Sequence, residues 1–79
     1  MNYHLLYFAR MGEEAGVAQE QFETDTRDAL TLYAELSERH GFTLPVDSLR
    51  IAVNGVFVDW DHGLGEGDEI TFIPPVSGG

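Results

Sequence analysis

The 79-residue chain contains no cysteine and no lysine. Without cysteine it can form no disulfide, no thiolate-bound zinc or iron–sulfur centre, and no cysteine nucleophile. Without lysine it offers no internal side-chain amine as an isopeptide acceptor. Its four arginines stand against fourteen acidic residues, which gives a formal net charge of −10. This charge argues against nucleic acid or an anionic membrane surface as a partner, and it favours a more basic protein.

Long apolar runs are also missing, since none approaches the ~18 residues of a membrane span. The chain opens into an apolar segment without a basic leader region, so we expect no signal peptide and a cytoplasmic location. The length suits one small domain, and an apolar content of 43% suits a folded core.

Apolar periodicity and turn signals predict one helix and about five strands. Residues 3–8 are apolar on both faces, which is typical of a strand with a neighbour on each side. Residues 25–40 have one apolar stripe, including Leu30, Tyr33 and Leu36, and predict a helix that ends at Gly41. The other predicted segments are a turn over 11–16, an edge strand over 17–23, a helix cap at Asp25 or Thr26, strands over 50–53 and 56–58 joined by Asn54-Gly55, a loop over 59–68, and a strand over 69–73.

The order β-β-α-β-β-β predicts an α+β fold of the ubiquitin-like β-grasp type. In this fold a mixed sheet of about five strands carries one main helix packed on one face. The helix is the only long connection, so it should join two strands that run in the same direction. We expect residues 1–75 to form the β-grasp domain and residues 76–79 to be a flexible Gly-Gly tail.

The end of the sequence, Pro74-Pro75-Val76-Ser77-Gly78-Gly79, carries the main functional signal. The two prolines end the last strand because neither can donate a ladder hydrogen bond. Gly78 and Gly79 have no side-chain bulk and wide conformational freedom, so they can enter a narrow channel and present the terminal carboxylate inside another protein. That carboxylate could attack the α-phosphate of ATP. The alternative is a terminus without chemical function.

Three stretches resemble the small subunit of molybdopterin synthase. Leu64–Gly79 resembles the C-terminal signature of that family, and Leu6–Arg10 with Glu13 and Gly16 resembles its first strand and following loop. Ala52–Gly55 resembles its central hairpin. Gly12 departs from the pattern, because many members carry a basic residue there.

The resemblance implies a sulfur carrier for molybdenum cofactor synthesis, not a stand-alone enzyme. Gly79 would be adenylated by an E1-like enzyme that uses ATP, and a sulfur donor enzyme would convert it to a thiocarboxylate, a C-terminal 1-thioglycine. The carrier would then give sulfur to cyclic pyranopterin monophosphate in a heterotetramer with the large synthase subunit. Two alternatives stay open: a carrier for thiamine, tRNA thiolation or cysteine synthesis, and a ubiquitin-like interaction module whose tail does no chemistry.

The remaining candidate residues concern partner binding. The partner surface should be apolar at its centre and acidic at its rim. Its predicted members are Phe8, Phe72, Ile73, Pro74, Pro75, Val76 and Ser77. We expect no bound metal or cofactor, because the closest metal-like motif, Asp59–Asp61, lacks the glutamate that a calcium loop needs at its twelfth position.

Overall fold

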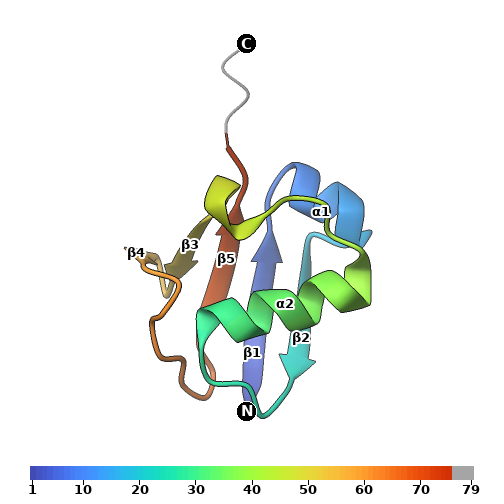
Figure 1. Ribbon diagram of the computed structural model, residues 1–79. Coiled ribbons are helices and arrows are strands. Elements are labelled where there is room, and N and C mark those ends of the chain that lie inside the picture. The colour runs from blue at the N-terminus through green and yellow to red at the C-terminus, as the bar shows by residue number, and fades with distance from the viewer. Residues whose placement is uncertain (76–79) are drawn as a thin grey trace.

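In residues 1–75, which the computed structural model describes, five strands form one mixed sheet and helix α2 crosses one of its faces (Figure 1). The strand order is β2-β1-β5-β3-β4, with β1 and β5 parallel and every other neighbouring pair antiparallel. This arrangement confirms the predicted β-grasp fold. The elements are β1 (Asn2–Tyr7), α1 (Arg10–Ala15), β2 (Gln19–Glu23), α2 (Ala29–His40), the 3-10 helix η1 (Val46–Ser48), β3 (Arg50–Val53), β4 (Val56–Val58) and β5 (Glu69–Ile73).

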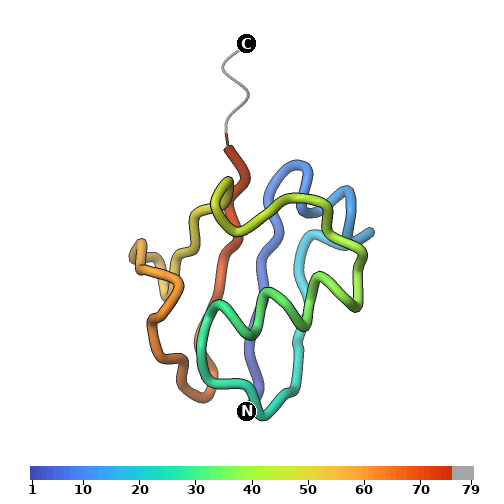
Figure 2. Tube along the Cα trace, viewed as in Figure 1, coloured from blue at the N-terminus to red at the C-terminus, as the bar shows by residue number. Residues whose placement is uncertain are grey.

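Strand positions follow the sequence pattern closely. The doubly apolar β1 lies between β2 and β5, and the more polar β2 lies at the edge. Because β2 is antiparallel to β1 and β3 is antiparallel to β5, β2 and β3 run in the same direction, as expected for strands joined by α2. The N-terminus and the segment that follows β5 lie at opposite ends of the sheet (Figure 2).

The β3–β4 hairpin has the predicted two-residue turn. Asn54 and Gly55 have φ values of 52° and 84°, and positive φ at both central residues is what a type I′ turn requires. The Asn54 side chain also fixes the start of β5. Its Nδ2 donates to Asp68 Oδ1 at 2.9 Å, and its Oδ1 accepts from the Glu69 backbone N–H at 3.0 Å.

Helix α2 differs from the prediction at its N-terminus and in its buried face. Asp28, rather than Asp25 or Thr26, caps the helix by accepting a hydrogen bond from the Thr31 backbone N–H. Its buried residues are Ala29, Leu32, Tyr33 and Leu36, whereas Leu30 is 49% exposed. The helix packs on the sheet with Leu32, rather than the predicted Leu30, on its buried face. The helix sequence alone does not specify on which side the sheet lies. Gly41 ends the helix with φ 73°, as predicted.

The predicted turn over 11–16 is instead helix α1. Met11 on this helix is fully buried in the core, and Gly16 closes the helix in the left-handed conformation. A six-residue segment gains little from intrinsic helix propensity. Its packing on the core therefore supplies the stability, which explains why the local sequence did not indicate it.

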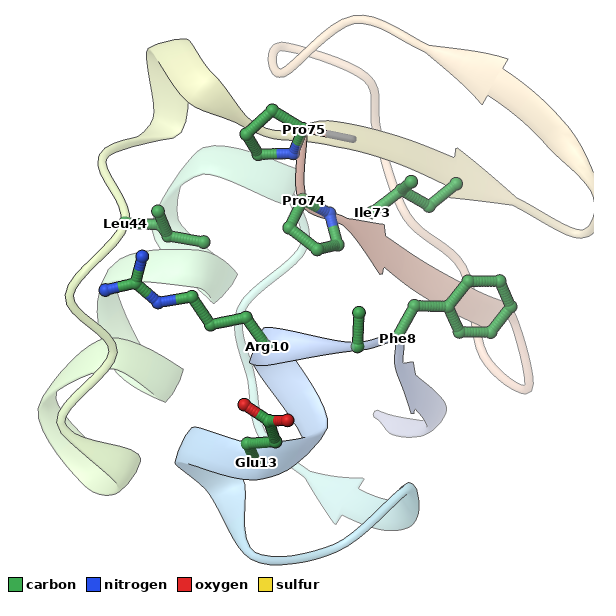
Figure 3. Close-up of a pocket in the computed structure, with 8 residues that line it drawn as sticks. Phe8, Arg10, Glu13, Leu44, Ile73, Pro74 and Pro75 are labelled. Atoms are coloured by element: carbon green, nitrogen blue, oxygen red, sulfur yellow. The ribbon is translucent and has the colours of Figure 1, made fainter. Parts of the chain in front are cut away.

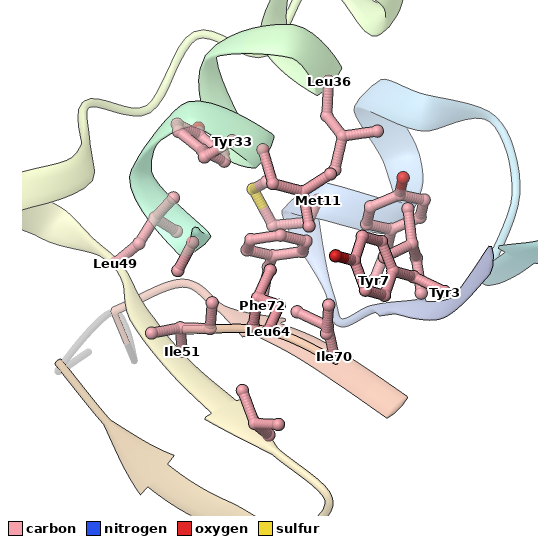
Figure 4. Packing of buried hydrophobic residues seen from close by; sticks show 14 residues of the cluster. Tyr3, Tyr7, Met11, Tyr33, Leu36, Leu49, Ile51, Leu64, Ile70 and Phe72 are labelled. Atoms are coloured by element: carbon pink, nitrogen blue, oxygen red, sulfur yellow. The ribbon is translucent and has the colours of Figure 1, made fainter. Parts of the chain in front are cut away.

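The core fills the space between α2 and the inner face of the sheet (Figure 4). Three aromatic side chains pack at its centre, with the Tyr33 and Phe72 ring centroids 5.6 Å apart and those of Tyr7 and Phe72 6.1 Å apart. The buried cluster consists of Tyr3, Leu5, Tyr7, Met11, Ala29, Leu32, Tyr33, Leu36, Leu49, Ile51, Val53, Leu64, Ile70 and Phe72.

In the described part of the chain, no helix is long and apolar enough to span a membrane.

A largely buried polar cluster joins β1, β2 and the end of α2. Glu20 Oε1 accepts a hydrogen bond from the Tyr7 hydroxyl at 2.7 Å and lies 2.7 Å from His40 Nε2. Burial raises the pKa of Glu20, but the hydrogen bonds from Tyr7 and His40 outweigh it, so the pKa lies below its ordinary value of 4.5.

This cluster predicts a pH-dependent contribution to stability. Glu20→Gln keeps the shape of the side chain but removes its charge, and it should cost about 1–3 kcal/mol near neutral pH. Because the folded-state pKa is lowered, this contribution is present above the unfolded-state pKa and is lost as pH falls through the folded-state pKa. Urea unfolding of both proteins at pH 7 and pH 3 should show a difference that shrinks in acid. An equal difference at both pH values would contradict the assignment.

Candidate functional site

A pocket lies at the end of the sheet where β5 leaves the domain (Figure 3). Since β1 and β5 are parallel, their C-terminal ends meet at this same edge. In Figure 3, Pro74 lies at the centre, with Leu44 and Arg10 to one side and Phe8 and Ile73 to the other. The full lining is Phe8, Ala9, Arg10, Glu13, Leu44, Ile73, Pro74 and Pro75.

Ala9 turns the chain from β1 into α1 at the pocket. Its φ of 48° and ψ of −122° are rare for a residue with a Cβ, so the backbone is strained there. The sharp turn directs the chain so that Phe8 and Arg10, on either side of Ala9, both line the pocket.

Two sets of hydrogen bonds hold the loop that contributes Leu44. The Glu14 carboxylate accepts from the Thr43 backbone N–H at 2.9 Å and from the Thr43 hydroxyl, and the Tyr33 hydroxyl donates to the Leu44 carbonyl. The hydrogen bonds from the Thr43 hydroxyl and backbone lower the pKa of Glu14, with a smaller contribution from Arg10. Glu14 is therefore ionised at neutral pH, and the loop is fastened to both helices.

The outer face of the sheet, opposite α2, is apolar over several strands. The registers place Phe57, Ala52, Thr71 and Leu6 in one row across β4, β3, β5 and β1. Phe57 is 56% exposed, whereas Ala52 and Thr71 beside it are buried, so α2 and its loops leave the Phe57 end of this row open to solvent.

The same face reaches the pocket. Tyr7 pairs with Phe72, so the next residues along each strand, Phe8 and Ile73, lie side by side, and both line the pocket. Phe8 is 51% exposed. We call this surface the outer-face patch, and its members are Leu6, Phe8, Phe57 and Ile73.

The predicted partner residues fall into three groups. Phe8, Ile73, Pro74 and Pro75 come together at the pocket, as part of one surface. Phe72 was predicted wrongly, because alternation along β5 turns it into the core, where it is fully buried. The third group, Val76 and Ser77, lies outside the described residues, as do the predicted reacting residues Gly78 and Gly79.

The sequence interpretation missed several residues of this surface. Phe57 could have been found, because a two-residue Asn54-Gly55 turn pairs it with Ala52 on the face opposite Ile51. Leu44 and Arg10 had no such signal, since the folded loop and the strained turn bring them to the pocket. Within residues 1–75, no group of three or more histidine, aspartate or glutamate side chains is placed to hold a metal ion.

Comparison with known proteins connects this geometry to one family. The ThiS family model matches residues 5–79, which includes the Gly-Gly end. The molybdopterin synthase sulfur carrier subunit of Escherichia coli (strain K12) is 38% identical over 78 residues, which cover 95% of this chain and 96% of that protein.

Two solved structures have the same fold. One is in a protein–protein complex of subunits 1 and 2 of molybdopterin-converting factor from Helicobacter pylori, with 26% identity, a TM-score of 0.71 and complete coverage of both chains. The small archaeal modifier protein 1 of Haloferax volcanii has a TM-score of 0.80 over 95% of this chain and 98% of that one, and at 21% identity it supports the fold alone. With the family match and the E. coli relative, these findings confirm the resemblance drawn from the sequence: the chain belongs to the ThiS family, in the group that contains the molybdopterin synthase sulfur carrier subunits.

Proposed function

We propose that this protein is the sulfur carrier of a molybdopterin synthase and that sulfur travels as a thiocarboxylate on Gly79. The observation that carries the proposal is the family match, which extends through the last residue of the chain. The geometry supports it, because Pro74 and Pro75 lead the chain away from an apolar pocket at the end of the sheet. The relatives' shared name favours this pathway over thiamine, tRNA thiolation or cysteine synthesis.

The proposed chemistry takes place on the main chain. The terminal carboxylate attacks the α-phosphorus of ATP, pyrophosphate leaves, and an acyl adenylate forms. Sulfur delivered at the oxidation level of sulfide by a donor enzyme then attacks the acyl carbon, AMP leaves, and the thiocarboxylate forms. An E1-like activating enzyme would supply the ATP site, so this protein needs no catalytic side chain and no bound cofactor of its own.

The proposed partner is the large subunit of molybdopterin synthase, in the heterotetramer that the resemblance implies. The Helicobacter pylori structure, a complex of subunits 1 and 2, supports a partner of this kind. The outer-face patch and the pocket beside it offer an apolar surface that leads directly to the start of the tail. Since this chain carries a net charge of −10, we expect a basic partner and an association rate that falls as salt rises.

The patch predicts which side chains this association needs. Phe8→Ala and Phe57→Ala should each weaken binding to the large subunit by about tenfold or more, because buried aromatic anchors dominate interface energies. Both side chains are more than half exposed, so thermal stability should change little. Leu30→Ala removes a similarly exposed apolar side chain on the helix side and should leave affinity unchanged. Isothermal titration calorimetry measures the affinity of all three variants for the large subunit. Equal affinities would show that the patch is not part of the interface.

Mass spectrometry of the intact protein tests the function. Incubation with the activating enzyme, ATP and a sulfur donor should convert the chain to a form heavier by the exchange of one oxygen for sulfur. The gain should lie in the C-terminal peptide and should require ATP. A chain that binds these enzymes but never gains sulfur would support the passive interaction module instead.

A further inference from the structure

Arg50 is an isolated positive charge on the outer face of the sheet. It is exposed at the start of β3, it pairs in register with Ile73 of β5, and its guanidinium carbon lies 4.2 Å from the centroid of the Phe57 ring. It therefore lies between two members of the outer-face patch, and its stem packs on one of them.

No carboxylate within residues 1–75 neutralises this charge. Arg10, the arginine at the pocket, forms an ion pair with Glu14 at 3.1 Å, whereas Arg50 has no ion pair with a residue of the described chain. Arg27 and Arg39 likewise form no ion pair within residues 1–75, but Arg50 is the arginine whose guanidinium lies against a member of the outer-face patch.

Covering the patch would remove water from this guanidinium. Burying an unpaired charge is strongly unfavourable, and a buried arginine is accommodated when a carboxylate accepts its hydrogen bonds. Because no carboxylate of residues 1–75 lies within ion-pair distance of Arg50, we expect the covering surface to supply one. A second copy of this chain is a poor source, because two molecules of charge −10 repel each other.

We propose that Arg50 is a partner-recognition residue, and that the protein covering the outer-face patch presents an aspartate or glutamate carboxylate to it within an otherwise basic surface. This proposal rests on the proposed function, since it takes the large subunit as the covering protein. It adds the chemistry of the contact: one acidic side chain placed between the contacts to Phe57 and Ile73.

Whether a substitution strengthens or weakens binding separates this specific contact from the long-range electrostatic attraction between the two proteins. Toward a basic partner, making the chain more negative should by itself speed and strengthen binding. Arg27→Glu, a charge reversal of an exposed arginine that precedes α2, should therefore bind the large subunit as well as the wild type or better. Arg50→Glu makes the same change in net charge but should weaken binding by at least about tenfold, because it places two carboxylates together.

A neutral variant separates charge from packing. Arg50→Met keeps an apolar stem for contact with Phe57 and removes only the charge, and it should also weaken binding by about tenfold or more. Calorimetric titration with the purified large subunit gives the affinities, and thermal unfolding should remain close to wild type for every variant.

Several results would overturn the proposal. If Arg50→Met or Arg50→Glu bound the large subunit as tightly as the wild type or more tightly, the proposed contact between Arg50 and a partner carboxylate would be wrong. Gly79-dependent gain of sulfur in the same variants would still support the proposed function. Self-association that Arg50→Met abolishes would assign the patch to a second copy. If the wild type did not bind the large subunit at all, both proposals would fail together.

Discussion

Deleting Gly79 should abolish sulfur transfer while leaving the fold and its thermal unfolding unchanged. In the proposed mechanism the reacting group is the terminal carboxylate, and its position in the partner's active site depends on the length of the tail. Misplacing a reacting group by a fraction of a residue's length costs roughly 10²-fold in rate, and a whole residue should cost at least that. The measurement is turnover of cyclic pyranopterin monophosphate in the reconstituted system.

Two further variants make this result specific. A chain extended by one alanine keeps every native residue but moves the carboxylate, so it should fail as the deletion does. Gly78→Val keeps the length but adds bulk and restricts φ, and it should impair transfer without changing stability. Turnover by the protein that lacks Gly79 would refute a carrier mechanism and favour the passive interaction module.

The second large expected effect is on the free energy of unfolding and concerns the core between α2 and the sheet. Leu36→Ala should destabilise the domain by about 2–5 kcal/mol, because Leu36 is fully buried between α2 and the sheet and its truncation leaves a cavity. For a domain of typical stability, about 5–15 kcal/mol, this is a large share. Denaturant unfolding gives the difference directly.

Leu30→Ala provides the matched control on the same helix. The two substitutions remove the same atoms, but Leu30 is half exposed, so its loss should cost within about 0.5 kcal/mol. Equal costs for the two variants would contradict the orientation of α2 described above.

The parts of the fold that could be predicted from the sequence are those set by local chemistry. Asn54-Gly55 fixes a two-residue hairpin by positive φ at both positions, and the alternation of Ile70 and Phe72 with a Pro-Pro stop fixes the last strand. Gly41 likewise ends α2 as expected. Each signal acts within a few residues.

The parts that escaped prediction depend on contacts between distant segments. The face of α2 that is buried follows from where the sheet lies, so Leu32 replaced Leu30 in the core. Leu44 reaches the pocket only because Glu14 and Tyr33 hold its loop. Phe8, Ile73, Pro74 and Pro75 share one surface because β1 and β5 are parallel, and that pairing brings segments from near the two ends of the described chain together.

A single-turnover experiment tests the central claim most directly. The chain is prepared chemically as its Gly79 thiocarboxylate and mixed with the large subunit and cyclic pyranopterin monophosphate, without ATP or activating enzyme. The account predicts that the intact mass returns to that of the carboxylate form as the dithiolene product appears in proportion. A thiocarboxylate that keeps its sulfur while bound to a competent large subunit would contradict it.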